Sequence, residues 1–366
     1  MLLESLFIFL SLCSQRLSSY QVEMNTTDHQ SEDCNVLDIY APGESPVSRL
    51  FLTVTLVHCY GVLVFGTLGN ALALWCVGTC AKTRRPVKVM LFSVFLPALV
   101  VCLVTRPVIG EIRIALLTCD PQRISVTVVQ INMVVYNILA QIELTTIAAV
   151  AVVRAVSVWA PQRQALGLRG TVALVTAICV YSTLTGLVSS KQPELLHGVL
   201  VMVVTDEMDH LRILVTVLFF INTTLPALIT AAAYILMIYK IQRNKRRLAA
   251  SQQQGRETTT MDQATRAMLA VFISNMVFGL PHSIYHLMGR QPHFMNILFH
   301  VLFSTHFVMD PLAFVWFNSC YRRRVFSRMK KVTRSISSVP TSSFLHASSV
   351  SPSDHHHDSN PKEENA

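Results

Sequence analysis

Seven stretches of predominantly apolar residues run through the chain, each about twenty residues or longer. They lie at 50–78, 87–109, 124–153, 170–190, 211–239, 265–288 and 295–317. A helix needs about twenty apolar residues to cross the hydrocarbon core of a bilayer. We therefore predict an all-α, seven-transmembrane helix bundle over residues 50–317, embedded in a lipid bilayer as a multi-pass protein.

The charged residues agree with a membrane protein and suggest its orientation. Only 14% of the 366 residues are charged, whereas soluble domains contain about a quarter. If residue 1 lies outside, the inner loops and tail hold 22 of the 30 Lys and Arg residues. Since cytoplasmic loops carry the positive excess, we expect an extracellular N-terminus and a cytoplasmic C-terminus. The cations flank apolar spans, so anionic lipid and acidic protein surfaces are expected partners, and nucleic acid is not.

The N-terminal segment 1–49 is expected to be extracellular. Residues 2–13 resemble the apolar part of a signal peptide, but Glu4 and the lack of a basic start argue against one, so cleavage within 1–14 stays open. Asn25 begins an Asn-Thr-Thr glycosylation acceptor. Cys34 and Cys119 are the two cysteines expected in the oxidising exterior, where they are able to pair.

Two further segments follow the last span. Residues 318–331 interleave cations with Tyr321, Val325, Phe326 and Met329, a pattern typical of a short amphipathic interfacial helix. Residues 332–366 are rich in Ser, Pro and His, and we predict a disordered cytoplasmic tail with serines open to phosphorylation.

Short motifs recur in successive spans. The motif residues are Gly69-Asn70 in span 1, Arg154 followed by Pro161 after span 3, Pro226 and Tyr234 in span 5, Phe278-Gly279-Leu280-Pro281 in span 6, and Asp310-Pro311-Leu-Ala-Phe314 in span 7. In order and spacing they resemble the rhodopsin-like (class A) G-protein-coupled receptors over about residues 50–330.

The resemblance implies a function at the plasma membrane. Arg154 would contact a heterotrimeric G protein, an unknown extracellular ligand would bind the outer half, and the Ser-rich tail would recruit arrestin. The residues implied in signalling are Arg154, Tyr234, Pro281, Asp310, Pro311 and Phe314. No enzyme signature, cofactor motif or metal-ligand spacing stands out.

The chain also departs from the family pattern. Ala98 replaces the buried Asp of span 2, Val153 replaces the acid beside Arg154, and Gly279 replaces the Trp of span 6. Residues 180–319 contain no cysteine, so the family disulfide to the second outer loop cannot form. Because Val153 cannot restrain Arg154 at rest, we expect raised basal activity.

Two carboxylates lie deep within the spans, Glu143 and Asp310. Intramembrane ionisable groups are costly and suggest function. Glu143 precedes Arg154 by three helical turns, and His306 precedes Asp310 by one, so each pair shares a helix face. By the resemblance, Asn70 joins Glu143, His306 and Asp310 in one inner site. A proton or ion site and a structural hydrogen-bond cluster both stay open.

The resemblance also points to a ligand pocket. Its candidate residues are Tyr136, Asn137, Asn222, His282, His286 and His300. Tyr136 stands where amine receptors carry a carboxylate, so a simple protonated amine is disfavoured and a neutral, anionic or peptide ligand is expected. For each residue taken singly, a hydrogen bond between helices is an equally good interpretation.

Two other functions stay open from the sequence. The lost motif residues are compatible with a non-signalling protein of the same fold that acts as a decoy or as a partner subunit. An ion or substrate transporter would instead require flux that depends on Glu143 or Asp310. We expect the receptor, with an activation assay as the discriminating measurement.

Overall fold

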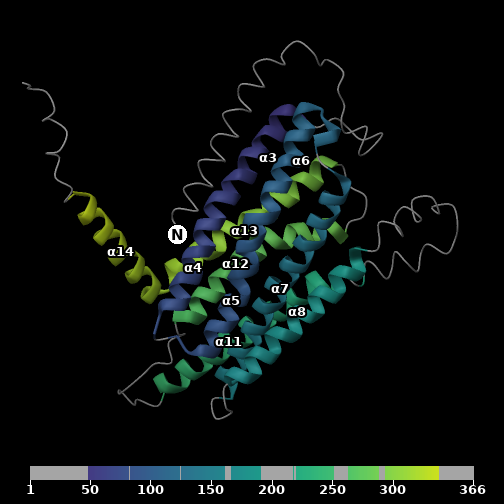
Figure 1. Ribbon diagram of the computed structural model, residues 1–366. Coiled ribbons are helices and arrows are strands. Elements are labelled where there is room, and N and C mark those ends of the chain that lie inside the picture. The colour runs from purple at the N-terminus through teal and green to yellow at the C-terminus, as the bar shows by residue number, and fades with distance from the viewer. Residues whose placement is uncertain are drawn as a thin grey trace, which may run out of the picture. The chain divides into compact units, whose positions relative to one another are not determined.

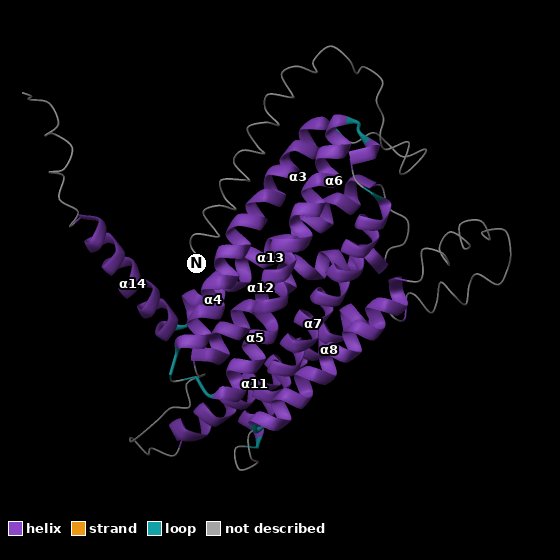
Figure 2. Ribbon diagram, viewed as in Figure 1, coloured by secondary structure: helices purple, strands orange, loops and turns teal. Residues whose placement is uncertain are grey.

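The computed structural model describes residues 48–81, 83–123, 125–160, 166–190, 217, 220–250, 263–287 and 293–337. Every regular element in these ranges is a helix (Figure 2). The expected signal peptide, Asn25, Cys34, Pro161 and the tail beyond residue 337 lie outside the described residues.

Seven of the helical segments are long and apolar enough to cross a membrane, which confirms the predicted fold class. The first combines α3 (Arg49–Gly61), η1 (Val62–Gly66) and α4 (Thr67–Thr79), and the second combines α5 (Arg85–Val100), η2 (Val101–Thr105) and α6 (Arg106–Thr118). The others are α7 (Val126–Trp159), α8 (Leu168–Ser190), η4 (Phe220–Thr224) with α11 (Leu225–Ala250), α12 (Gln263–Leu287) and α13 (His293–Phe317). The short 3₁₀ turn η3 (Pro121–Arg123) follows α6, and α14 (Ser319–Ser337) follows α13.

Three helices run further than the sequence predicted. The second span continues nine residues beyond 109 to Thr118, and the third continues past Arg154 to Trp159. Helix α14 ends at Ser337, six residues after the expected limit of 331, so residues 332–337 do not belong to an unstructured tail. In each case the extension is polar or mixed in composition. An apolar window marks only the membrane-crossing part of a helix, so it does not detect such an extension.

Spans 1 and 2 each contain one turn of π-helix, and these turns, η1 and η2, contact each other. Gly66 ends η1, and a Cβ atom on it would lie 2.6 Å from Cys102 Sγ in η2. One turn later, a Cβ atom on Gly69 would lie 2.9 Å from Pro311 Cγ. The two glycines therefore permit the close approach of span 1 to spans 2 and 7.

The spans run alongside one another in a bundle (Figure 1) and pack unevenly. Helix α12 packs mainly on α13, and α11 packs mainly on α7, whereas α11 and α12 contact each other sparsely. We call this loose boundary between spans 5 and 6 the seam. At one end of α7 the indole N–H of Trp159 donates to Leu236 O in α11 (3.3 Å), which fixes span 5 to span 3.

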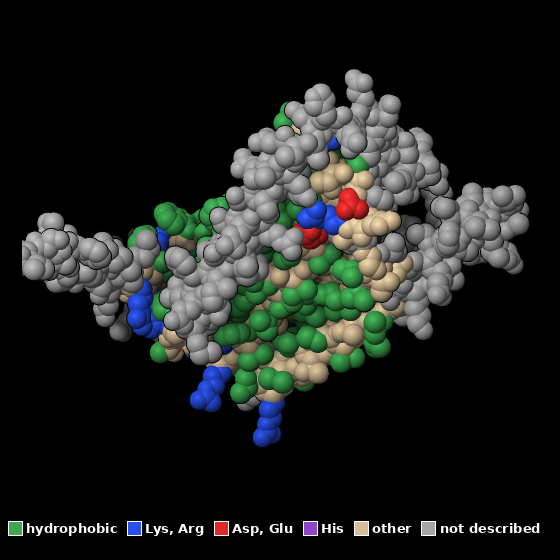
Figure 3. Space-filling view, turned by 45° about the horizontal axis from the view of Figure 1, so that its top comes forward, with side chains coloured by type: hydrophobic (Ala, Val, Ile, Leu, Met, Phe, Trp, Pro, Cys, Tyr) green, Lys and Arg blue, Asp and Glu red, His purple; other side chains and the backbone are tan. Residues whose placement is uncertain are grey.

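Apolar side chains cover the outside of the bundle, as a lipid environment requires. Examples are Val57, Phe65, Leu184 and Ile235, each more than half exposed. On the face drawn in Figure 3, apolar side chains form a broad region, with Lys or Arg side chains beside acidic ones above it and further Lys or Arg side chains below it. Helix α8 has the most exposed apolar window of the seven, with only 22% of it buried.

Candidate functional site

A cavity of about 630 Å³ lies within the bundle, between spans 3, 5, 6 and 7. Five of the six predicted pocket residues line it, namely Tyr136, Asn137, Asn222, His282 and His300. The side chain of the sixth, His286, lies outside the described part of the chain. Along α7 the lining extends from Met133 to Ile147, a depth of roughly 21 Å at 1.5 Å per residue. The cavity is thus deep enough to bring an occupant close to Glu143.

Amides and hydroxyls organise the side of the cavity near span 4. Asn222 Oδ1 accepts hydrogen bonds from Gln141 Nε2 (2.8 Å) and from the Tyr181 hydroxyl (2.7 Å), and Thr185 Oγ1 donates to Gln141 Oε1 (2.9 Å). These bonds join α7, α8 and η4. For Asn222 the interpretation as a link between helices is therefore correct, and the residue also lines the cavity.

Phe303 is the centre of an aromatic cluster at the floor of the cavity, and the sequence analysis did not identify it. Its ring stacks on His282 (4.5 Å), meets Tyr136 edge-on (6.4 Å) and lies 4.5 Å from His306, centroid to centroid. A Cβ atom on Gly279 would lie 3.7 Å from Phe303 Cε2. Phe303 of span 7 thus packs beside the position of Gly279 in span 6.

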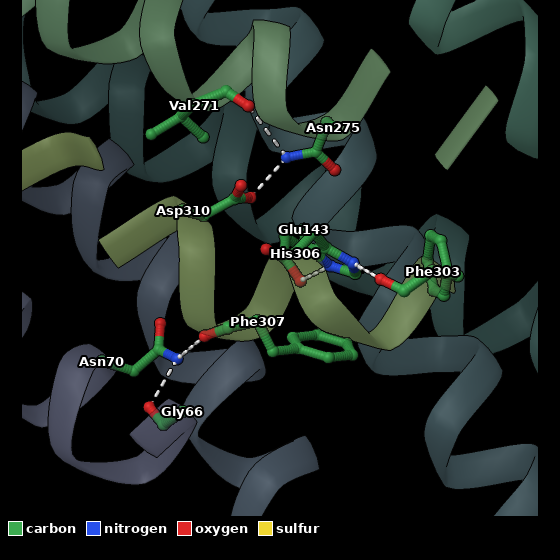
Figure 4. Close-up of polar contacts among 9 residues, drawn as sticks. All are labelled: Gly66, Asn70, Glu143, Val271, Asn275, Phe303, His306, Phe307 and Asp310. Carbon is green, nitrogen blue, oxygen red and sulfur yellow. Dashed lines mark hydrogen bonds and ion pairs between the residues drawn. The ribbon is translucent and has the colours of Figure 1, made fainter. Parts of the chain in front are cut away.

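Below this cluster, Glu143, His306 and Asp310 converge as predicted (Figure 4). One oxygen or nitrogen atom from each lies within 4.8 Å of the others. All three side chains are buried, with residue exposures of 3%, 2% and 1%. They come from α7 and α13, so the cluster joins spans 3 and 7 inside the apolar bundle.

The hydrogen bonds of His306 define its tautomer. Its Nδ1 is bonded to the carbonyl oxygen of Phe303, and because a carbonyl oxygen only accepts, Nδ1 carries a proton. Nε2 lies 3.7 Å from Glu143 Oε2. Nε2 therefore has two possible states. It holds a second proton and faces the Glu143 carboxylate as a cation, or it presents a lone pair toward a proton or cation between His306 and Glu143. An imidazole whose Nδ1–H binds a carbonyl is also oriented as metal-ligating histidines are.

Asn275 of span 6 completes the cluster and was missed by the sequence analysis. Its Nδ2 donates to Asp310 Oδ2 and to Val271 O, the latter at 3.2 Å. The signal was present as a polar Ser274-Asn275 pair within an apolar run six residues before Pro281. Asp310 Oδ1 is buried and has no hydrogen-bond partner among the described residues. The cluster therefore has an unused acceptor that a proton, a water molecule or a cation would satisfy.

Asn70 lies beside this cluster, and its contacts agree with the structural interpretation, one of the two that the sequence left open. Its Nδ2 donates to Gly66 O (2.8 Å) and to Phe307 O (2.9 Å), which ties span 1 to span 7 through the backbone (Figure 4). The carbonyl of Phe307 is available because Pro311, four residues later, has no N–H to bind it. The bonds that Asn70 makes are structural ones.

The remaining motif residues lie toward the other end of the bundle. Arg154 is half-buried, two helical turns beyond the cavity floor at Ile147, and its charge acts on the buried Tyr234 hydroxyl of α11. Tyr234 stacks on Phe272 of α12 (5.3 Å) and so bridges the seam. Pro281 lies within α12 without interrupting it.

The motif at the end of span 7 connects to α14. Phe314 is fully buried, and its ring centroid lies 4.7 Å from that of Phe95 and 5.2 Å from that of Tyr321. The Tyr321 hydroxyl lies 3.2 Å from Thr83 Oγ1. Burial raises the pKa of Tyr321 to about 12, although the Thr83 contact acts in the opposite direction. The first turn of α14 is therefore held by both span 7 and the turn after span 1.

Cys119 forms a disulfide and adopts a left-handed conformation (φ 57°) at the end of α6. Six other cysteines in the described ranges are thiols that form no disulfide. Cys34, the partner expected for Cys119, lies outside these ranges.

A buried arginine was also missed. Arg106 begins α6, has an exposure of 5%, and directs its guanidinium toward the rings of Tyr136 and Phe307. The signal was its position inside the second apolar window, 87–109.

No protein-family model matches the chain, and a search of curated proteins found no similar sequence.

Proposed function

We propose that the chain is a receptor of the rhodopsin-like type, which passes the binding of an outer ligand to a heterotrimeric G protein at the plasma membrane. The observation that carries the proposal is the deep cavity, because its lining includes Glu143 and His306 of the polar cluster. An occupant of the cavity would press directly on a polar cluster that joins spans 3, 6 and 7.

The packing supports a route from the cavity to the opposite end. Phe303 connects the cavity residue His282 to His306, and Asp310 and Asn275 connect spans 7 and 6. Spans 6 and 7 pack closely, as do spans 5 and 3, so a ligand-driven shift would separate the two pairs at the seam. Parting there would uncover Arg154 for the G protein.

The proposed orientation has the N-terminus outside the cell and the C-terminus inside, which is open to a direct check. In intact cells, antibody should reach an epitope tag at the N-terminus, whereas a tag at the C-terminus should be reached only after the plasma membrane is permeabilised. Tags on the same side would contradict the proposal.

The function is tested by G-protein activation in cells that express the full chain, without added ligand and across the main G-protein classes. We expect a basal signal that Arg154→Ala abolishes at equal surface expression. Arg169→Ala removes an exposed arginine at the start of α8 and is the matched control, with no expected loss.

A second variant examines the resting restraint. Val153→Glu restores an acid beside Arg154 and is expected to lower the basal signal, by about tenfold for each 1.4 kcal/mol of new pairing. If no G protein responds, or if Arg154→Ala leaves the signal unchanged, the chain is a non-signalling protein of this fold and the receptor proposal fails.

A further inference from the structure

Arg106 places a full positive charge deep within the second membrane span. It stands at residue 22 of the 34-residue segment Arg85–Thr118, and only 5% of its surface is exposed. A guanidinium remains charged in any protein environment, and a charge buried in a membrane protein is almost always paired. The arrangement around Arg106 therefore raises the question of its counter-ion.

No acid forms an ion pair with Arg106 within the part of the chain that the structure describes. Glu111, on the same helix, binds Arg123 (3.0 Å), and Glu143 faces His306 (3.7 Å). Instead, the guanidinium carbon lies 5.8 Å from the ring centroid of Tyr136 and 5.4 Å from that of Phe307. Arg106 Nε is buried without a hydrogen-bond partner among the described groups. Aromatic faces attract the cation but provide no acceptor for Nε.

The same region holds further positive charge. Arg113 lies two turns after Arg106 and therefore on the same face of α6. The charges of both arginines act on Cys59 of span 1. Within the described ranges neither has an acidic partner. The local field thus favours an anion, and no acid in the described ranges is paired with either arginine.

Arg106 adjoins the ligand cavity through one side chain. Tyr136 lines the cavity, and the Arg106 guanidinium lies over its ring. Tyr136 therefore forms part of the wall between the cavity and Arg106. The rest of the nearby lining is largely apolar, with Met133, Leu144, Met276 and Phe303. The space suits a ligand with an apolar body and an anionic group at the end that meets Tyr136.

We propose that Arg106 recognises the anionic headgroup of a single-chain amphiphile whose apolar body fills the cavity, with Tyr136 moving aside to admit the headgroup. A carboxylate or a phosphate would each supply the two or more acceptors that a guanidinium fork binds. This inference rests on the proposed function, since it names the ligand class of that receptor.

The test is equilibrium binding to the purified full chain in nanodiscs of zwitterionic lipid. The probes share one chain and differ in headgroup, namely oleate, oleyl phosphate, neutral oleyl alcohol and cationic oleylamine. We expect saturable binding of one or both anionic probes and none of the alcohol or amine. Comparison of oleate with oleyl phosphate decides between a fatty-acid-like and a phospholipid-like ligand. Equal binding of the alcohol, or no saturable binding of either anion, would overturn the proposal.

Variants assign the binding to Arg106. Arg106→Met keeps an unbranched apolar stem and should weaken binding of the anionic probe by about 30-fold or more. Arg123→Met is the matched control, because Glu111 already neutralises that arginine, and its affinity should equal that of the wild type. Equal losses in both variants would indicate general electrostatics and would contradict a specific site.

A second readout separates ligand recognition from a structural role. If Arg106 lacks a counter-ion in the ligand-free protein, Arg106→Met should unfold at the same temperature as the wild type or higher, and the anionic probe should raise the melting temperature of the wild type alone. A marked loss of stability in ligand-free Arg106→Met would mean that the arginine is internally satisfied. Neither measurement involves a G protein, so this inference and the receptor proposal fail independently.

Discussion

The buried pair between Glu143 and His306 allows a quantitative test of the polar cluster. With the second proton on His306, two unit charges 3.7 Å apart attract each other by about 4.5 kcal/mol at an effective dielectric constant of about 20. Both side chains are almost fully buried, so removing one partner leaves the other without compensation. We expect Glu143→Leu to lower the free energy of unfolding by about 3–5 kcal/mol, the usual cost of breaking a buried pair.

The double variant gives the decisive comparison. Replacing both partners, as in Glu143→Leu with His306→Phe, removes the desolvation cost together with the attraction and is expected to be nearly neutral. The coupling free energy should therefore be at least about 2 kcal/mol and favourable. Penalties that simply add would refute the reasoning, because they would mean that the two side chains do not interact.

Buried thiols provide the assay. Cys76 and Cys102 are fully buried thiols outside any disulfide, so a thiol-reactive fluorogenic dye reports their exposure as the purified protein is heated. For domains of this order, 3–5 kcal/mol corresponds to a fall in melting temperature of roughly 6–20 °C. Thr146→Val is the matched control, since it removes a buried hydroxyl without a described partner one turn from Glu143 and should cost nothing.

Three further outcomes are expected. Gly69→Ala should destabilise the protein by about 1–3 kcal/mol in the same assay, because the new methyl group would lie 2.9 Å from Pro311 Cγ; an unchanged melting temperature would argue against the close contact of spans 1 and 7. Mild oxidation should join Cys80 to Cys320, whose sulfur atoms lie 2.8 Å apart, as a cross-linked peptide in mass spectrometry; its absence would contradict the position of the first turn of α14. The pKa of Tyr321 is raised from 10.0 to about 12, so between these pH values the hydroxyl ionises in the unfolded chain but not in the folded one, and the free energy of unfolding falls as pH rises through this window. The Tyr321→Phe variant should lose less stability over the same window. Equal losses in the variant and the wild type would mean that the hydroxyl is not buried.

The sequence was sufficient for the spans, because twenty consecutive apolar residues are a local property. Helix spacing placed His306 and Asp310 on one face of span 7, and the family resemblance, not the spacing, grouped them with Glu143 of span 3. The sequence did not identify Asn275 or Phe303, whose roles depend on how span 6 is rotated against span 7. That rotation is set by side-chain packing across the bundle, which no single stretch of sequence contains.

Arg106 and Asn70 illustrate the same limit in opposite directions. Arg106 stood inside an apolar window, but only the positions of Tyr136 and Phe307 show that its charge has aromatic neighbours and no acid within the described residues. Asn70 was grouped with the acids because of its place in the motif. Its amide instead bonds two backbone carbonyl groups, one of them exposed by the proline of span 7.

The seam between α11 and α12 has a consequence for how this molecule tolerates variation over time. Side chains that interlock within the α12–α13 pair or the α11–α7 pair must change together, because a size change on one helix creates a void or an overlap on the other. Across the seam that requirement is weak. Correlated substitutions among descendants of this gene should therefore concentrate inside each pair, while the two facing surfaces drift separately, and a coupling to a new intracellular partner would be acquired most readily there.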